Sequence, residues 1–178
     1  RMVARAAGEH VDAIISFSSD WDRVAEVAAG VKAHPGYLYA AYGIHPDNIK
    51  RGNDKAFAMK MGELRQLALT SECIALSAGL DMTREIASHY AQQRLLADHL
   101  ALAAEIRLPI LLHSVSAHER LAEMLAEFRA GDAAAADAPV AATPSGTTSV
   151  SWAIAAAAGA GAIAHDTDVV PEGVAATG

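Results

Sequence analysis

The sequence predicts an α/β protein of the βα-barrel type, and two features of the chain indicate it. Short apolar runs of strand length alternate with longer segments of helical periodicity, and the joints between them are short. Three of the apolar runs end in polar residues, in the segments Gly43–Pro46, Gly79–Asp81 and Leu108–His113. A βα-barrel builds its site in this way, because side chains at the carboxyl ends of successive parallel strands converge on one mouth.

The first part of the chain supplies two strands and two helices. Val11–Ser18 has the length and apolar content of a short buried strand, and Tyr37–Ile44 is the next strand. Between them, Trp21–His34 is predicted to be a helix with Asp20 as its N-cap, because its apolar residues recur at three and four positions. Lys55–Leu69 is the second helix, reached through a polar loop.

The middle of the chain repeats the pattern twice. Glu72–Leu80 is predicted to be a strand, and Arg84–Arg107 is the longest helical stretch, with apolar residues near helical spacing. Leu108–His113 is the fourth strand, and Ala117–Arg129 is the helix that follows it. This order predicts a parallel sheet covered by helices.

The composition changes at Ala130, which divides the chain into residues 1–129 and residues 130–178. Residues 130–151 are rich in Ala, Asp, Pro, Ser, Thr and Gly, and we interpret them as an irregular connection with one weak strand, Ala138–Ala142. Ser151–Ala160 is predicted to be a poor helix, and Ala160–Ala164 a short strand. This low-complexity quarter is expected to be the least stable part, because it buries little side-chain surface.

Overall composition narrows the class of protein. The 178 residues fit one domain or a large part of one, and the formal charge of −7 gives no general attraction for nucleic acid. Cys73 is the only cysteine, so no internal disulfide and no cysteine-based zinc site is expected. No apolar segment approaches the roughly 20 residues that span a bilayer, and no secretory signal is readable. The sequence leaves the compartment open, with an intracellular one favoured. Because Arg1 is no natural initiator, the chain is expected to be a processed product or a fragment.

Several other polar residues have simpler interpretations. His89 and His99 lie ten residues apart in one predicted helix, but no carboxylate stands at ligand spacing, so they do not form a ligand pair. His118 opens a helix and is expected to face solvent. Ser114 and the other serines lack a histidine and aspartate at any known motif spacing, so serine hydrolase chemistry has no support.

Three segments together carry a family resemblance: Leu38–Pro46 (LYAAYGIHP), Ile74–Asp81 (IALSAGLD) and Gln92–His118. Their order and spacing resemble the TatD family of metal-dependent deoxyribonucleases, which are βα-barrels of the amidohydrolase type. The resemblance covers the chain from Val11 to Phe128. It implies a TIM-like (β/α) barrel that is expected to be incomplete here, because the family's first strand, ending in His-x-His, has no counterpart and part of the C-terminal end is missing.

The resemblance also implies an activity and a set of site residues. The family hydrolyses phosphodiesters with two divalent cations, Mg²⁺, Mn²⁺ or Zn²⁺, which activate water and neutralise the leaving oxygen. On this chain His45 falls at the catalytic histidine that contacts the scissile phosphate, and His113 at a metal-ligand histidine. Asp81 falls at the aspartate that supports the ligands from the second shell.

Other positions depart from the family pattern. Ser77 stands where the family has a bridging glutamate, and Ala142 where it has a second strand-end histidine. Val115 replaces an arginine suited to phosphate, and His99 replaces the second glutamine of a helical Gln-x3-Phe-x2-Gln pattern. A hydroxyl such as that of Ser77 cannot bridge two divalent cations.

A last match lies near the end of the chain. Asp166-Thr167-Asp168 resembles the family's Glu-Thr-Asp-x-Pro strand end, whose aspartate is catalytic and binds metal, and this would make Asp168 a ligand. A second alignment makes residues 160–166 an earlier strand, with the true aspartate missing. The intervening sequence is too simple to choose between the two.

These residues favour a TatD-like protein whose metal site is largely lost, and which is catalytically inactive and acts as a structural or interaction subunit without a cofactor. The alternative is an active divalent-metal-dependent DNase of the exonuclease type, and a third interpretation is an unrelated doubly wound α/β domain. An incomplete barrel leaves open sheet edges, so a protein partner or a homo-oligomer is expected to cover them. DNA is expected as a partner of the active form alone, and no membrane is expected.

Overall fold

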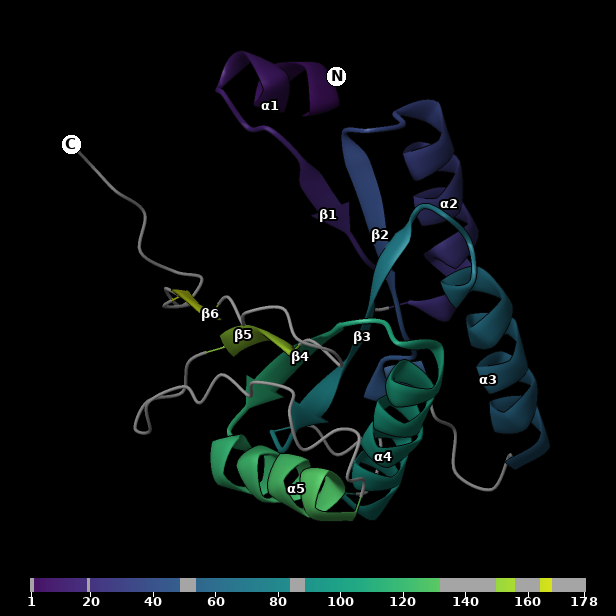
Figure 1. Ribbon diagram of the computed structural model, residues 1–178, viewed down its shortest axis with the longest axis vertical. Helices are drawn as coiled ribbons and strands as arrows, with labels where there is room; N and C mark the ends of the chain where they lie inside the picture. The colour runs from purple at the N-terminus through teal and green to yellow at the C-terminus, as the bar shows by residue number, and fades with distance from the viewer. Residues whose placement is uncertain are drawn as a thin grey trace.

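A computed structural model describes residues 2–18, 20–48, 54–83, 89–131, 150–155 and 164–167. A single six-stranded sheet organises them, with the strands in chain order from one edge to the other (Figure 1). The elements are α1 (Met2–Gly8), β1 (Ile14–Ser16), the 3₁₀ turn η1 (Trp21–Arg23), α2 (Val24–Ala33), β2 (Leu38–Tyr42), the 3₁₀ turn η2 (Pro46–Asn48), α3 (Asp54–Ala68), β3 (Cys73–Asp81), α4 (His89–Ile106), β4 (Ile110–Val115), α5 (His118–Gly131), β5 (Val150–Ala155) and β6 (Ala164–Thr167).

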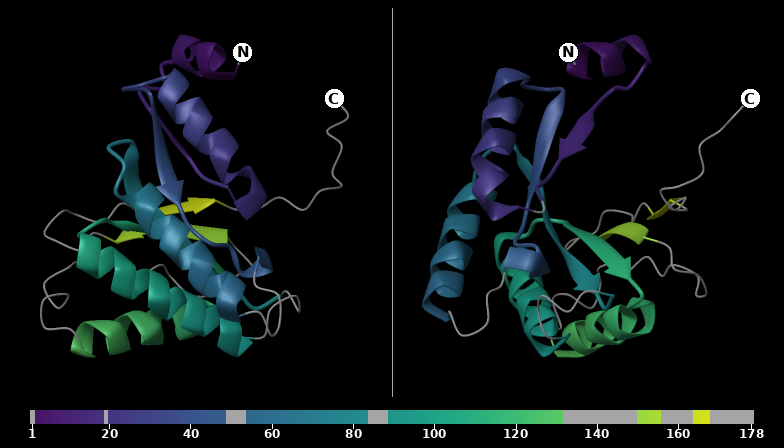
Figure 2. Two further views of the ribbon diagram at one scale, coloured as in Figure 1. Left: turned by 90° about the vertical axis from the view of Figure 1, so that its right-hand side faces the viewer. Right: turned by 180° about the vertical axis from the view of Figure 1, so that it is seen from behind.

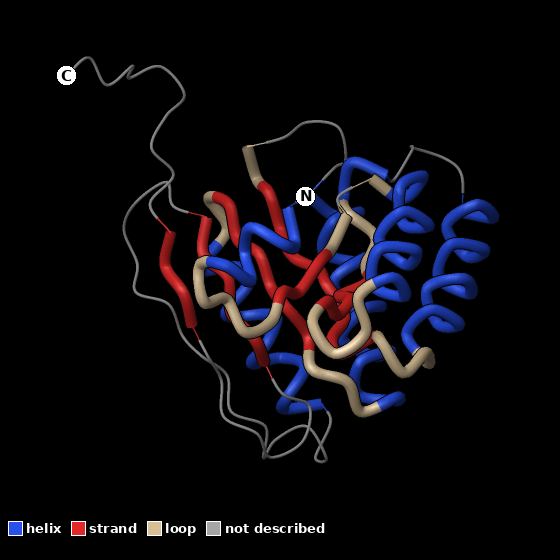
Figure 3. The backbone as a smooth tube through the Cα atoms, turned by 90° about the horizontal axis from the view of Figure 1, so that it is seen from above, coloured by secondary structure: helices blue, strands red, loops and turns tan. Residues whose placement is uncertain are grey.

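Strands β1 to β4 are parallel, and their register aligns their carboxyl ends at one edge. Gly79 of β3 pairs with His113 of β4, and Asp81 pairs with Val115. Helices α2, α3, α4 and α5 contact these strands and lie along one side of the curved sheet, as the turned views show (Figures 2 and 3). The four βα units therefore form about half of a TIM-like barrel, which confirms the predicted fold class.

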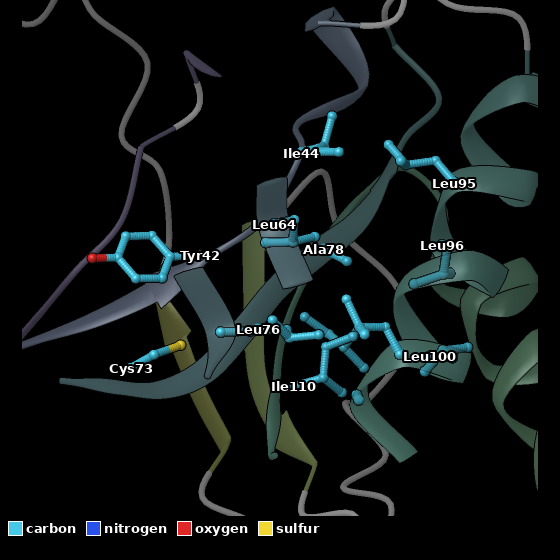
Figure 4. Close-up of a cluster of buried hydrophobic side chains, with 14 of the residues drawn as sticks. Tyr42, Ile44, Leu64, Cys73, Leu76, Ala78, Leu95, Leu96, Leu100 and Ile110 are labelled. Atoms are coloured by element: carbon cyan, nitrogen blue, oxygen red, sulfur yellow. The ribbon is translucent and has the colours of Figure 1, made fainter. Parts of the chain in front are cut away.

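The core lies between the sheet and this helical layer. Leu76, Ala78 and Leu80 alternate along β3 and are at most 2% exposed, and they share one cluster with Leu64 of α3 and Leu96 of α4 (Figure 4). Successive side chains of a strand point to opposite faces of the sheet, so every second residue of a strand faces this core. Full burial of one leucine contributes about 2 kcal/mol to stability.

The opposite face of the first strands is more open. Ile14 packs against the core, whereas Ile15 is 38% exposed and Phe17 just beyond β1 is 42% exposed. Parallel strands are usually apolar on both faces because both are covered in folded proteins. This face therefore exposes more apolar surface near β1 than the face toward the helices does.

Most predicted elements before Ala130 are found within a few residues of their expected ends. Asp20 is an N-cap, as predicted: its side chain accepts a hydrogen bond from the N–H of Asp22. That cap begins η1, so the predicted helix is a 3₁₀ turn followed by α2. Among the described residues no helix is both long and apolar enough to cross a bilayer.

The prediction for Ser151–Ala160 is wrong in its first half. Residues 150–155 form β5, which pairs antiparallel with β4, and β6 pairs antiparallel with β5. The sequence Val-Ser-Trp-Ala-Ile-Ala alternates large and small residues with the period of a strand, and this signal outweighs the helical propensity of alanine. The predicted strand Ala160–Ala164 coincides with β6 at Ala164 alone, and Ala138–Ala142 lies outside the described residues.

Candidate functional site

Three strand ends meet at the carboxyl edge of the parallel sheet. His45 follows β2 by three residues, Asp81 ends β3, and His113 lies in the second half of β4. The sequence predicted this meeting of the three segments, and the register places Gly79 of β3 directly beside His113. The edge is the mouth of the half-barrel, the position where βα-barrels carry their chemistry.

The two histidines of the mouth stack on each other. Their ring centroids are 5.2 Å apart and the planes are inclined by 16°. His113 is 6% exposed, and burial, helped by the nearby His45, lowers its pKa from the ordinary 6.5 to about 4. Both nitrogens of the ring therefore remain without a positive charge at neutral pH, which is the form that binds a metal ion.

Two glycines allow the strands of the mouth to approach closely. A Cβ at Gly79 would lie 2.6 Å from Cγ of His113, and one at Gly43 would overlap the carbonyl oxygen of Ser77. No side chain larger than hydrogen fits at either position, so the motif glycines have a steric cause. The ring of His113 packs directly on the backbone of β3 because of Gly79.

Asp81 is held by its own turn. Its Oδ1 accepts hydrogen bonds from the backbone N–H of Thr83 (3.0 Å) and from the Thr83 hydroxyl, and the residue is 7% exposed. This is the hydrogen bonding of an Asx turn, in which the carboxylate fixes the chain that leaves the strand. Asp81 thus shapes the mouth next to the histidines, and its role in supporting metal ligands stays a prediction.

Two residues of α4 reach the same strand ends from behind. Gln92 hydrogen bonds to the backbone of Asp81, and Nε2 of His99 accepts a hydrogen bond from the N–H of Ile44 at 3.0 Å. Both side chains are fully buried, and burial lowers the pKa of His99 to about 4. Sequence reasoning assigned them no function. The available signal was the helical Gln-x3-Phe-x2-Gln pattern, in which Gln92 is the first glutamine and His99 replaces the second.

Comparison with known proteins identifies the family. The model of the family described as "TatD related DNase" matches residues 1–140. This chain belongs to the TatD family. Its curated relatives include the 3'-5' ssDNA/RNA exonuclease TatD of Yersinia pseudotuberculosis, 31% identical over 126 residues, which are 70% of this chain and 47% of the relative. The enzyme of the same name from Pantoea ananatis is 35% identical over 95 residues, 53% of this chain and 35% of the relative.

A solved structure supports the same relation. The TatD homolog YjjV from Escherichia coli K12 superimposes with a TM-score of 0.62 and 30% sequence identity, over 71% of this chain and 48% of that protein. The chain therefore spans about half the length of the TatD proteins that it matches. Its four parallel strands and their helices carry the TatD half-barrel, and the doubly wound alternative is wrong.

The TatD family depends on divalent metals, so the donors of the mouth can be tested against such a site. Ser77 lies on β3 two residues before Gly79 and faces the same side of the sheet, and the family resemblance implies a carboxylate at its position. Among the described residues, no group of three or more His, Cys, Asp or Glu side chains is close enough to hold a metal ion. The donors present in this part of the chain do not fit a two-metal site.

Three further predictions concern single residues. Ala142 and Asp168 lie outside the described residues, so their assignments stay predictions. The prediction that His118 faces solvent is wrong: the residue is half-buried, its Nδ1 lies 2.9 Å from the Ser114 hydroxyl, and its Nε2 is buried. Ser114 lies just before the turn into α5, and its hydroxyl turns the ring of His118 inward.

Proposed function

We propose that this chain is a TatD-family protein whose two-metal site is largely lost and which acts as a structural or interaction subunit. The observation that carries the proposal is Ser77 at the position of the bridging glutamate. A hydroxyl keeps its proton at neutral pH, so it cannot supply the shared negative charge that holds two divalent cations a few ångströms apart.

The neighbouring donors support the same conclusion. His113 offers a neutral imidazole whose ring stacks on that of His45. The carboxylate of Asp81 is engaged by Thr83. Hard cations such as Mg²⁺ need several oxygen ligands to displace water, and one imidazole does not replace them.

A role as a subunit requires a surface for a partner. Ile15 and Phe17 on the open face of the sheet are apolar and exposed, and β1 pairs with β2 alone within the described part of the chain. An edge strand with apolar neighbours readily pairs with another chain. We therefore include a protein partner or a second copy of this chain in the proposal, and a monodisperse monomer in sedimentation at micromolar to millimolar concentration would contradict it.

The direct test of the lost site is an exonuclease assay on the purified chain. Single-stranded DNA is incubated with excess Mg²⁺, Mn²⁺ or Zn²⁺, and we expect no release of nucleotides and weak metal binding by calorimetry. His113→Ala is the matched control, since it removes the remaining ligand and should change neither result. Metal-dependent cleavage that His113→Ala abolishes would sink the proposal.

The second candidate function is an active divalent-metal-dependent DNase of the exonuclease type. The names of the relatives and the close placement of His45 and His113 favour it. It requires ligands from outside the described residues, Asp168 being one candidate. Ser77→Glu separates the two: an active site that already holds its metals should lose activity, whereas a decayed site should gain metal affinity by at least about tenfold, which corresponds to about 1.4 kcal/mol.

A further inference from the structure

Helix α4 carries two buried polar residues that face the sheet. Gln92 and His99 are seven residues apart, which is two helical turns, so they lie on the same side of the helix. Both are fully buried among leucines such as Leu95 and Leu96. Buried polar groups in an apolar layer cost stability unless their hydrogen bonds are satisfied, so their partners explain why they are tolerated.

Gln92 fixes the end of β3 with both ends of its amide. Its Oε1 accepts a hydrogen bond from the N–H of Asp81 at 2.9 Å, and its Nε2 donates one to the carbonyl oxygen of the same residue at 2.8 Å. A side-chain amide that takes the place of a neighbouring strand holds the backbone in both position and orientation. The residue held in this way is the aspartate of the mouth.

His99 fixes the segment after β2 with one nitrogen. Nδ1 lies 2.8 Å from the carbonyl oxygen of Leu95, and Nε2 lies 3.0 Å from the backbone nitrogen of Ile44. A carbonyl can only accept and a backbone N–H can only donate, so one tautomer alone satisfies both: neutral, with its proton on Nδ1. Ile44 lies two residues beyond the end of β2, where no strand ladder supplies a partner, and His45 follows it.

We propose that Gln92 and His99 are positioning residues, which set the places of Asp81 and His45 at the mouth from the helical layer. The mouth then keeps its shape without a metal ion, since its backbone is anchored to α4. The inference goes beyond the proposed function and holds for either candidate activity, because it concerns where the side chains lie and not what they bind.

Two variants of His99 distinguish a positioning role at the mouth from a purely structural role in the core. His99→Leu removes the bond to Ile44 and keeps an apolar side chain of similar volume. His99→Gln keeps an acceptor for the same N–H. The matched control is Leu100→Ala on the next position of the helix, which removes core packing at a residue that is 5% exposed and bonds to no strand end.

The experiment uses NMR on the full chain, with urea unfolding in parallel. The readouts are the nuclear Overhauser effect between the rings of His45 and His113 and the amide exchange of Ile44. We expect His99→Leu to weaken the ring–ring signal at least threefold and to speed the exchange of Ile44 at least tenfold in a folded protein. Leu100→Ala should lower the urea midpoint and leave the ring–ring signal within twofold of the parent.

Each other outcome overturns the proposal. An intact ring–ring signal in folded His99→Leu, or an equal loss in Leu100→Ala, would reduce His99 to a core residue. If His99→Leu fails to fold, His99→Gln decides alone: it should retain the ring–ring signal within twofold and the slow exchange of Ile44. Loss of the ring–ring signal together with fast exchange of Ile44 in a folded His99→Gln protein would contradict positioning through the bond from Ile44.

Discussion

The two faces of the parallel sheet differ in what they carry. The face toward the helices holds Leu76, Leu80 and Leu112, all at most 2% exposed, whereas Ile15 on the opposite face is 38% exposed. Alternation assigns Ser77 and His113 to that second face. The helix-facing side therefore carries the large leucines of the core, and the family resemblance assigns Ser77 and His113, on the other side, to its chemistry. A position such as Ser77, where the resemblance implies a ligand, can change without loss of the fold, because function is carried by side chains placed on a scaffold.

The contact between neighbouring strands supports both faces at once, and breaking it should have the largest effect. Gly43→Ala places a methyl group on the carbonyl oxygen of Ser77, which is backbone and cannot turn away. We expect a loss of about 4 kcal/mol or more in the free energy of unfolding. Gly30→Ala in α2 is the matched control, because nothing lies within 4 Å of its Cβ, and it should stabilise the protein by up to about 1 kcal/mol. Equal urea midpoints for the two variants would refute the steric role of Gly43.

Shortening a leucine on the helix-facing side of the sheet should have the next largest effect on stability. Leu80→Ala removes a side chain that is 0% exposed in the main cluster. The expected cost is about 3 kcal/mol, the middle of the range for buried leucines. Urea unfolding followed by circular dichroism measures it, and a cost below about 1 kcal/mol would show that this layer is loosely packed.

Acid should destabilise the protein through the buried histidine of the helical layer. The pKa of His99 is about 4 in the folded chain and near 6.5 when the chain is unfolded. As pH falls below 6.5 the unfolded chain binds the proton first, so stability is complete above pH 6.5 and decreases toward pH 4. One such group removes about 2 kcal/mol between pH 6.5 and pH 5. The difference between the parent and His99→Gln, followed by urea unfolding across this range, isolates the effect; parallel pH profiles would exclude it.

The elements that local sequence determines were predictable, and the contacts between distant segments were not. Strand β3 and its Gly79–Asp81 end follow from a short apolar run and a motif. The bond from Ile44 to His99 joins residues 55 positions apart, and no local periodicity encodes it. The strand β5 was mistaken for a helix because alanine-rich sequence has a helical propensity that pairing with β4 overrides. The departure at Ser77, in the middle of β3, rests on the motif alone and stays a prediction.

The smallest effect is expected on the open face. Ile15→Thr keeps a β-branched side chain in β1 and removes apolar surface that is already 38% exposed, so the isolated chain should lose less than about 1 kcal/mol. If this face contacts a partner or a second copy, the same change acts on association and not on folding. Sedimentation should then show a smaller share of the larger species at equal concentration, while the urea midpoint at high dilution stays the same. A loss of several kcal/mol in the monomer would instead mean that the open face belongs to the core, and that the two faces of the sheet are equivalent.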